Sequence, residues 1–149
     1  MVALIAAYDP EGEGPEVITT AAELDTVLDR VAEWGHRALV ELRPADPADG
    51  LTHRYSLSVG LHGDADQGTL IYSSSDGMWF SKATPGPEWV EAERILYYFM
   101  SSDTEYPPDS EIPAGVVRRA AHEFMTAGGQ LPTGPDWHTP PPWYPTPFR

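Results

Sequence analysis

The sequence predicts a single α+β domain in which two helices pack on an antiparallel sheet arranged as a meander. Three observations lead to this fold class. A segment with helical spacing lies near each end of the chain. Several segments with the two-residue alternation of strands lie between them, and short turns rich in Gly, Asp and Ser connect most of these strands. Strands connected in this way pair as antiparallel neighbours, and helices cover the apolar face of the sheet.

The N-terminal part of the chain predicts a strand followed by a helix. Residues 2–8 are mostly apolar, and an acidic turn rich in Gly and Pro follows them. Thr20 and Glu23 have the spacing of a capping box, which marks the start of a helix, and Gly35 marks its end. Between these signals, apolar residues recur at helical spacing. They are Leu24, Val27, Leu28 and Val31.

The middle of the chain predicts the meander. Alternation is clearest over residues 54–61, where large apolar residues alternate with serines. A later strand carries two adjacent aromatic residues, Trp79 and Phe80, which must point to opposite faces of the sheet. The expected strands are 37–43, 54–61, 69–74 and 78–82.

The second half of the chain predicts one more strand and a second helix. Residues 94–102 carry apolar side chains on both faces, which indicates a central strand covered on both sides. The stretch 105–113, EYPPDSEIP, combines three carboxylates with three prolines, and we expect a rigid acidic loop there. Pro113 fits only the first turn of a helix, which places the helix start between residues 110 and 114. Two glycines at 128–129 end this helix.

The C-terminal stretch differs in composition from the rest of the chain. Seven prolines lie between Pro132 and Pro147, so regular structure beyond extended or polyproline segments is excluded there. We therefore expect a domain over residues 1–137 and a proline- and aromatic-rich tail over 138–149.

Charge is the strongest feature of the composition. Twenty-three acidic residues against nine basic ones give a formal net charge of −14. This balance argues against binding to a phosphate backbone or an anionic membrane surface. It favours a basic protein partner that is attracted at long range, although acidity that serves solubility alone is an equal alternative. The chain lacks cysteine, a signal peptide and an apolar run of about 20 residues, so we expect a cytoplasmic protein.

Motifs for catalysis and for cofactors are incomplete. The sequence HEFMT starts like a zinc-protease helix, but Thr126 stands where the second histidine is needed after His122. The stretch DADQG starts like a calcium loop, but Ser75 stands where a bidentate acid is needed. No glycine-rich phosphate loop and no nucleophile elbow occur. We expect no catalysis, no metal and no cofactor; a small hydrolase or isomerase that uses His122 and scattered acids stays open as an alternative.

Carboxylates and aromatic residues coincide in three places, and we expect partner contacts there. The main candidates lie on and before the acidic proline loop. A turn of the meander and the segment around Trp89 contribute weaker candidates. For Trp89 itself, the preferred interpretation is a side chain that anchors the loop to the core. The candidate partner-binding residues are Asp103, Glu105, Tyr106 and Asp109, with Asp76, Trp79 and Glu91 as the weaker ones.

The acidic proline loop has a purely structural interpretation as well. Ser110 would cap the second helix, and Glu111 would lie favourably near its positive end. This interpretation accounts for those two residues. It leaves Asp103, Glu105 and Asp109 without a role.

The order of these motifs resembles immunity protein family one, a family of bacterial polymorphic-toxin immunity proteins. The resemblance covers most of residues 1–137. It is carried by TTAAELDTVLDRVA, by LSVGLHGDADQGTLIYSSSDG and above all by the block from Tyr106 to Trp137, YPPDSEIPAGVVRRAAHEFMTAGGQLPTGPDW. In that block the family shows an acidic proline turn, a helix that ends in Glu-Phe, a glycine turn, a proline and a tryptophan. Gln130 and Leu131 depart from the Gly-Arg-Pro of many members.

The resemblance implies inhibition of a cognate toxin domain. Members of this family are often encoded beside nucleic-acid deaminase toxins, whose basic groove accepts a polyanionic strand. An acidic, rigid loop is suited to occupy such a groove and to compete with phosphate for its Arg and Lys side chains. The alternative is an acidic adaptor for another basic protein, and the neighbouring gene would distinguish the two.

Overall fold

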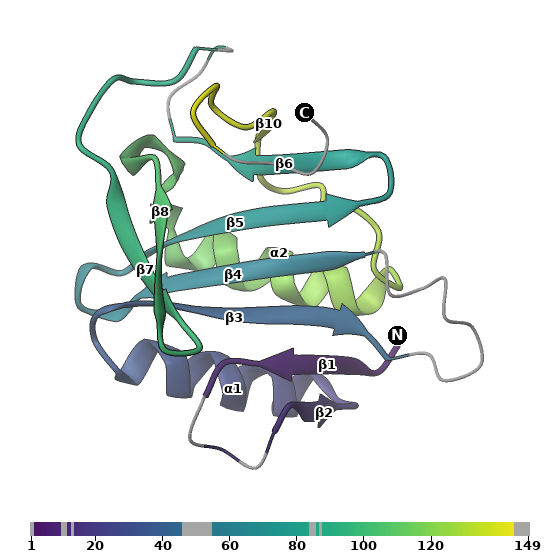
Figure 1. The fold of residues 1–149 in the computed structure, drawn as a ribbon. Helices are drawn as coiled ribbons and strands as arrows, with labels where there is room; N and C mark the ends of the chain where they lie inside the picture. The colour runs from purple at the N-terminus through teal and green to yellow at the C-terminus, as the bar shows by residue number, and fades with distance from the viewer. Residues whose placement is uncertain are drawn as a thin grey trace.

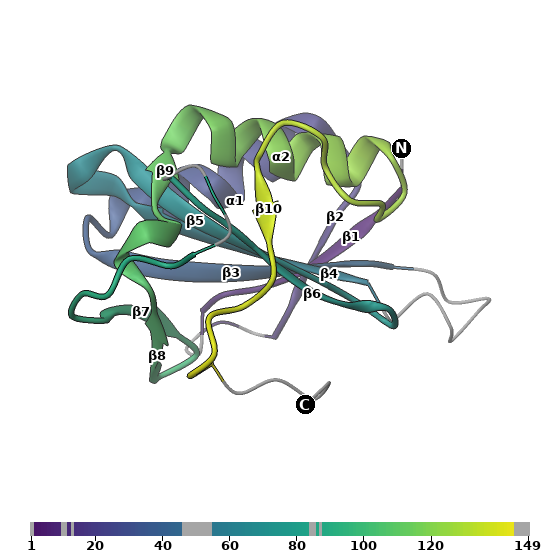
Figure 2. The ribbon, with the colours of Figure 1, turned by 90° about the horizontal axis from the view of Figure 1, so that it is seen from above.

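The computed structural model describes residues 2–9, 12, 14–45, 55–83, 86 and 88–144 of the 149-residue chain. The predicted α+β class is confirmed: a largely antiparallel sheet carries both helices on one face (Figures 1 and 2). The main path of the sheet has the strand order β10-β6-β5-β4-β3-β1-β2. Its strands are β1 (Leu4–Ala7), β2 (Glu16–Ile18), β3 (Arg37–Pro44), β4 (Ser56–His62), β5 (Gln67–Ser74), β6 (Gly77–Ser81) and β10 (Trp137–His138).

The first helix, α1 (Ala21–Glu33), starts at the predicted capping box. The side chain of Thr20 accepts a hydrogen bond from the backbone N–H of Glu23 at 3.1 Å, and the Glu23 carboxylate accepts one from the N–H of Thr19 at 3.1 Å. Gly35 follows the helix with φ of +80°, a left-handed conformation that favours glycine. The four predicted apolar residues of α1 are all buried against the sheet.

The second helix, α2 (Ala114–Thr126), starts within the predicted range, but its first turn has no side-chain cap. Pro113 occupies the cap position, so the interpretation of Ser110 as the cap is wrong. The Ser110 hydroxyl is buried instead, where it donates to the carbonyl of Pro107 at 2.7 Å and accepts from Thr69 at 2.9 Å. The helix packs on the sheet through Val117, Ala120, Ala121, Phe124 and Met125.

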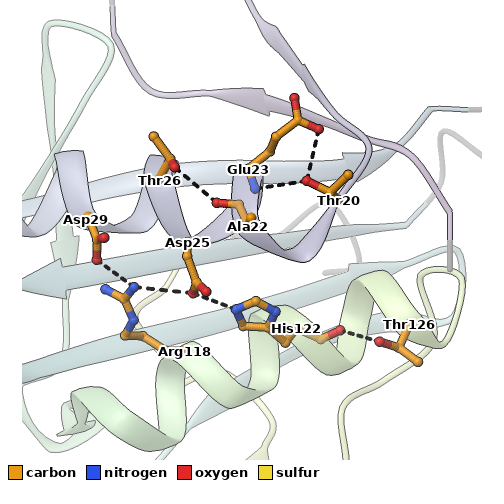
Figure 3. Close-up of polar contacts among 9 residues, drawn as sticks. All are labelled: Thr20, Ala22, Glu23, Asp25, Thr26, Asp29, Arg118, His122 and Thr126. Atoms are coloured by element: carbon orange, nitrogen blue, oxygen red, sulfur yellow. Dashed lines mark hydrogen bonds and ion pairs between the residues drawn. The ribbon is translucent and has the colours of Figure 1, made fainter.

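Charged side chains connect the two helices at their solvent side (Figure 3). Asp25 of α1 lies 2.7 Å from the Nε2 atom of His122, and Arg118 donates to Asp29 at 2.7 Å. The hydrogen bond with His122 is the main reason why the pKa of Asp25 is lowered. His122, the start of the incomplete zinc motif, is therefore part of a helix-to-helix contact.

The other face of the sheet carries a hairpin made of β7 (Ile95–Phe99) and β8 (Ser102–Tyr106) (Figure 2). The strand predicted at 94–102 is present over 95–99, but its predicted position as a central strand covered on both sides is wrong. β7 touches the main sheet through one parallel bridge, between Ala38 and Tyr98, and Leu96 on its outward side is 48% exposed. The hairpin closes a second core, separate from the core beneath the helices. Its buried members are Leu39, Ile71, Phe80, Tyr97 and Tyr106.

Adjacent aromatic residues of β6 point to opposite faces, as predicted. Trp79 packs against the core beneath the helices, and Phe80 is buried in the second core. The start of the predicted tail packs back as well: β10 pairs with β6, and the ring of Tyr144 lies 4.7 Å from that of Phe80 between centroids. The boundary at residue 137 stays a prediction, and residues 145–149 lie outside the described part of the chain. No helix among the described residues is long and apolar enough to cross a bilayer.

The turn of the β7–β8 hairpin is strained. Phe99 pairs with Ser102, so the loop consists of Met100 and Ser101 alone, with φ of 48° and 73°. Two consecutive residues in the left-handed conformation make a type I′ turn, and the two central positions of this turn favour Asn followed by Gly. Neither residue has the freedom of glycine, and left-handed backbone costs an L-residue about 1–2 kcal/mol.

Replacing the two turn residues tests this account. We expect the double variant Met100→Asn, Ser101→Gly to stabilise the protein by about 1 kcal/mol, because Asn and Gly adopt left-handed backbone more readily. The gain corresponds to a rise in Tm of about 2–4 °C for a chain of this size. The variant Met100→Ala, Ser101→Ala keeps the strain and serves as the control. Equal Tm values for the two variants would show that the turn stores no strain.

Candidate partner-binding site

The strongest candidate surface is the side of the β7–β8 hairpin that faces away from the sheet. Because side chains alternate along a strand, Tyr97 and Tyr106 point into the second core, while Leu96 and Glu105 point outward. The strand register pairs Leu96 with Glu105 and Tyr98 with Asp103, so each pair lies on one side of the hairpin. We name this surface the outer hairpin face. Its residues are Arg94, Leu96, Tyr98, Met100, Asp103 and Glu105.

An aromatic cluster extends the outer hairpin face at the end nearest the hairpin turn. The ring of Tyr98 makes T-shaped contacts with Trp34 and His36 at centroid distances of 6.4 and 6.0 Å. Trp34 and His36 stack at 6.2 Å, and Tyr8 lies 6.0 Å from Trp34. These residues come from the ends of separate elements, so no single stretch of sequence pointed to the cluster. Only the high count of aromatic residues gave a signal.

The tail contributes to the opposite end of the outer hairpin face. The guanidinium of Arg94 lies 3.9 Å from the ring centroid of Trp143 and 3.6 Å from the Glu105 carboxylate. A shallow pocket lies beside β8 at this end. Its lining residues are Leu96, Asp103, Thr104, Glu105, Trp143 and Tyr144. The tail therefore forms one wall of the candidate surface.

Two predicted contact residues of the acidic stretch are buried. Tyr106 is 1% exposed in the second core. The side chain of Asp109 is 6% exposed and lies 3.2 Å from the Nζ atom of Lys82, the one lysine of the sequence, which is itself fully buried. The indole of Trp89 lies above that ammonium at 5.6 Å, which agrees with the interpretation of Trp89 as an anchor. Burial removes Tyr106 and Asp109 from the surface that a partner could touch in this conformation.

Glu111 joins several elements at a buried junction. Its carboxylate accepts two hydrogen bonds from the Arg37 guanidinium, at 3.0 and 3.1 Å, and one from the Tyr97 hydroxyl at 2.6 Å. Burial by itself raises the pKa of Glu111, but the hydrogen bonds from Arg37 and Tyr97 outweigh it and hold the pKa below 4.5. The interpretation of Glu111 as a charge at the helix end is wrong. We name Arg37, Tyr97 and Glu111 the Glu111 junction.

The expected rigid acidic loop is therefore mainly an anchor. Glu105 and Tyr106 belong to β8, a short 3-10 turn follows at Pro108–Ser110, and Ile112–Pro113 form β9, which pairs with β5. Two of the three carboxylates between residues 105 and 113 are used inside the protein. Only Glu105 is exposed there, next to Asp103 on the outer hairpin face.

The three weaker candidates lie on other parts of the surface. Asp76 is exposed in the turn between β5 and β6, at the opposite side of Figure 1 from β7. Trp79 is half-buried 6.1 Å from Tyr72. Glu91 is exposed in a pocket that is bordered by Trp89 and Trp143, and Trp143 also borders the pocket beside β8. The structure thus brings Asp103 and Glu105 together, leaves Glu91 on the far side of Trp143, and places Asp76 and Trp79 elsewhere.

The described residues contain no group of three or more His, Asp or Glu side chains placed to hold a metal ion. The geometry of the outer hairpin face suits contact with a protein: exposed apolar and aromatic side chains lie beside two carboxylates. Arg94 supplies a single positive charge at one end.

The Glu111 junction makes a testable contribution to stability. We expect Glu111→Gln to destabilise the protein by about 2 kcal/mol, because the variant leaves the Arg37 charge without its carboxylate. The pKa of Glu111 is lowered by folding, so this contribution is present above pH 4.5 and is lost as the pH falls through the folded value. Denaturant unfolding at pH 7 and at pH 3 measures it. A difference between wild type and variant that does not shrink at pH 3 would contradict the charge-based account.

Comparison with known proteins agrees with the sequence resemblance. A family model described as Immunity protein Imm1 matches residues 12–139, which is most of the chain. No curated protein matches the chain. The matched region includes both helices, the hairpin and β10. The resemblance predicted from the sequence is confirmed.

Proposed function

The chain belongs to the immunity protein family Imm1, and from this premise we propose that its outer hairpin face binds a cognate toxin domain and blocks the toxin's substrate groove. Membership supports an immunity function with a toxin as partner and a role without catalysis. The toxin we propose is a nucleic-acid deaminase, which is the class that the family resemblance implied. Its groove must be basic to hold a polyanionic strand.

One observation carries the choice of surface: three of the seven large apolar side chains that are exposed among the described residues lie on or beside the hairpin that carries the two exposed carboxylates. Leu96 is 48% exposed, Met100 is 40% exposed and Trp34 is 36% exposed. Interfaces combine apolar and aromatic contact area with charge that sets register and speeds association. The outer hairpin face has both features within one hairpin and its aromatic extension.

The charges suit a cationic groove. Asp103 and Glu105 lie two residues apart on one strand, so their carboxylates project on the same side. In the proposed complex, each carboxylate accepts hydrogen bonds from an Arg or Lys side chain of the toxin groove, in place of a substrate phosphate. The net charge of −14 adds long-range attraction. The buried anchor beneath the hairpin reduces the ordering entropy that binding costs.

A pair of charge-reversal variants tests the proposed surface. We expect Asp103→Lys with Glu105→Lys to raise the Kd for the toxin domain encoded beside this gene by at least about 100-fold, because attraction becomes repulsion at the contact. The control is Asp76→Lys with Asp136→Lys, which changes the net charge equally at two exposed carboxylates outside the outer hairpin face. Surface plasmon resonance at two salt concentrations measures both, and circular dichroism checks the fold.

The control variant separates local contact from general attraction. We expect it to slow association modestly at low salt and to leave the dissociation rate unchanged. Equal loss of affinity in both variants would show that net charge alone governs binding. A loss confined to the control would place the interface near Asp76, the weaker sequence prediction. A tight complex with the hairpin variant would overturn the proposed surface.

A further inference from the structure

We propose that the partner binds by adding an extended segment to the free edge of β8, as a further strand of the hairpin. This inference rests on the proposed toxin partner and specifies how that partner docks. β8 pairs with β7, and within the described part of the chain no strand pairs with its other edge. An edge with free backbone groups is a template for another chain.

The turn geometry identifies which backbone groups of β8 are free. In a two-residue hairpin loop, the residues that flank the loop form a hydrogen-bonded pair, and pairs alternate from there. Phe99 and Ser102 flank the loop, so the pair of Tyr97 with Thr104 is hydrogen-bonded. Asp103 and Glu105 belong to the non-hydrogen-bonded pairs. Their N–H and C=O groups therefore point away from β7, toward the free edge.

The contact between β7 and β3 agrees with this assignment. Tyr98 stands opposite Asp103 in a non-hydrogen-bonded pair, so its backbone groups point away from β8. Tyr98 is also the residue through which β7 bridges to Ala38 of β3. The alternation thus gives each edge of the hairpin its own partner: β3 on the side of β7, and an incoming segment on the side of β8.

A cavity of about 210 Å³ opens between β8 and the sheet, where Thr104 and Tyr106 of the hairpin face residues of β3, β4 and β5. Strands β3, β4 and β5 continue past β8 in Figure 1. Ser58 and Ser73 project from β4 and β5 into this cavity, and the ring of Tyr144 borders both this cavity and the pocket outside β8. A strand paired with β8 would lie between the two hollows, with one set of side chains over the serines and the other set on the outer hairpin face.

Charge decides the occupant. A strand that pairs with Asp103 and Glu105 places its own alternate residues beside these carboxylates, so basic residues are favoured at every second position. A second copy of β8 would place Asp and Glu beside Asp and Glu, which is destabilising. The occupant we assign is therefore a segment of the toxin with Lys or Arg at alternate positions and small or apolar residues between them. This pattern suits the wall of a basic groove.

Hydrogen exchange of the intact protein tests strand addition directly. In the free protein we expect the amides of Asp103 and Glu105 to exchange fast and that of Thr104 to be protected. In the complex with the toxin domain encoded beside the gene, we expect exchange at Asp103 and Glu105 to slow by at least about tenfold. A stable complex with unchanged exchange at both amides would overturn strand addition and leave the immunity function standing. Failure to form any complex would overturn both.

Proline substitution separates the backbone contact from the carboxylate. Glu105→Ala and Glu105→Pro both remove the charge, but only the second removes the N–H donor at the edge. We expect Glu105→Pro to weaken toxin binding about tenfold more than Glu105→Ala, which corresponds to one lost hydrogen bond. Equal affinities of the two variants would contradict strand addition.

The same substitution one residue earlier checks the assignment of the backbone groups without a toxin. Thr104→Pro removes a donor that bonds to Tyr97, so we expect its Tm to fall well below that of Glu105→Pro. A larger loss of stability in Glu105→Pro would show that the N–H of Glu105 bonds to β7. The backbone groups of Asp103 and Glu105 would then point toward β7 and not toward the open edge, and the proposal would fail.

Discussion

The ion pair between Glu111 and Arg37 is the contact on which the position of the hairpin depends. Arg37 begins β3, Glu111 lies between β8 and α2, and the Tyr97 hydroxyl of β7 binds the same carboxylate. Hydrophobic packing of Tyr97 and Tyr106 brings the hairpin against the sheet, but packing alone is not directional. The bidentate geometry fixes where the hairpin lies, since a guanidinium and a carboxylate bind in one plane. Because the hairpin is already held in one position, it loses little conformational entropy when its outer face binds a partner.

Carboxylates that are close in sequence have opposite roles because strand alternation and burial separate them. Asp103 and Glu105 lie on the outward side of β8. Asp109 and Glu111 follow where the chain turns beneath the hairpin, and each meets a cation there. The inner carboxylates are paired because a buried charge without a partner is costly. The inner carboxylates thus hold the hairpin in place, and the outer carboxylates give the outer hairpin face its negative charge.

The sequence allowed the helices and the meander to be predicted, because capping signals, helical spacing and strand alternation are local properties. The hairpin was missed for a physical reason: its turn is Met100-Ser101, without the Gly or Asn that marks a two-residue loop. β8 is polar on its exposed side, and the prolines after Tyr106 predict a loop that includes its last two residues. The burial of Asp109 follows from a lysine 27 positions away in the chain, and no local pattern reports such a contact. The sequence predicts exposed acids at Asp103 and Glu105, and the structure exposes both. The sequence does not distinguish them from Asp109 and Glu111, which point inward.

The charges on β8 serve two demands that ordinarily conflict. An open strand edge with backbone donors and acceptors invites association with any extended chain, including a copy of itself. Covering the edge would prevent this but would also remove the surface from a partner. Asp103 and Glu105 leave the edge open and make it repel acidic segments, including a second copy of β8. The same carboxylates favour a basic strand, so selectivity arises from repulsion of the wrong partners as much as from attraction of the right one. The strained turn belongs to the same arrangement, because its two-residue loop sets the register that turns the backbone of these two residues toward the open edge.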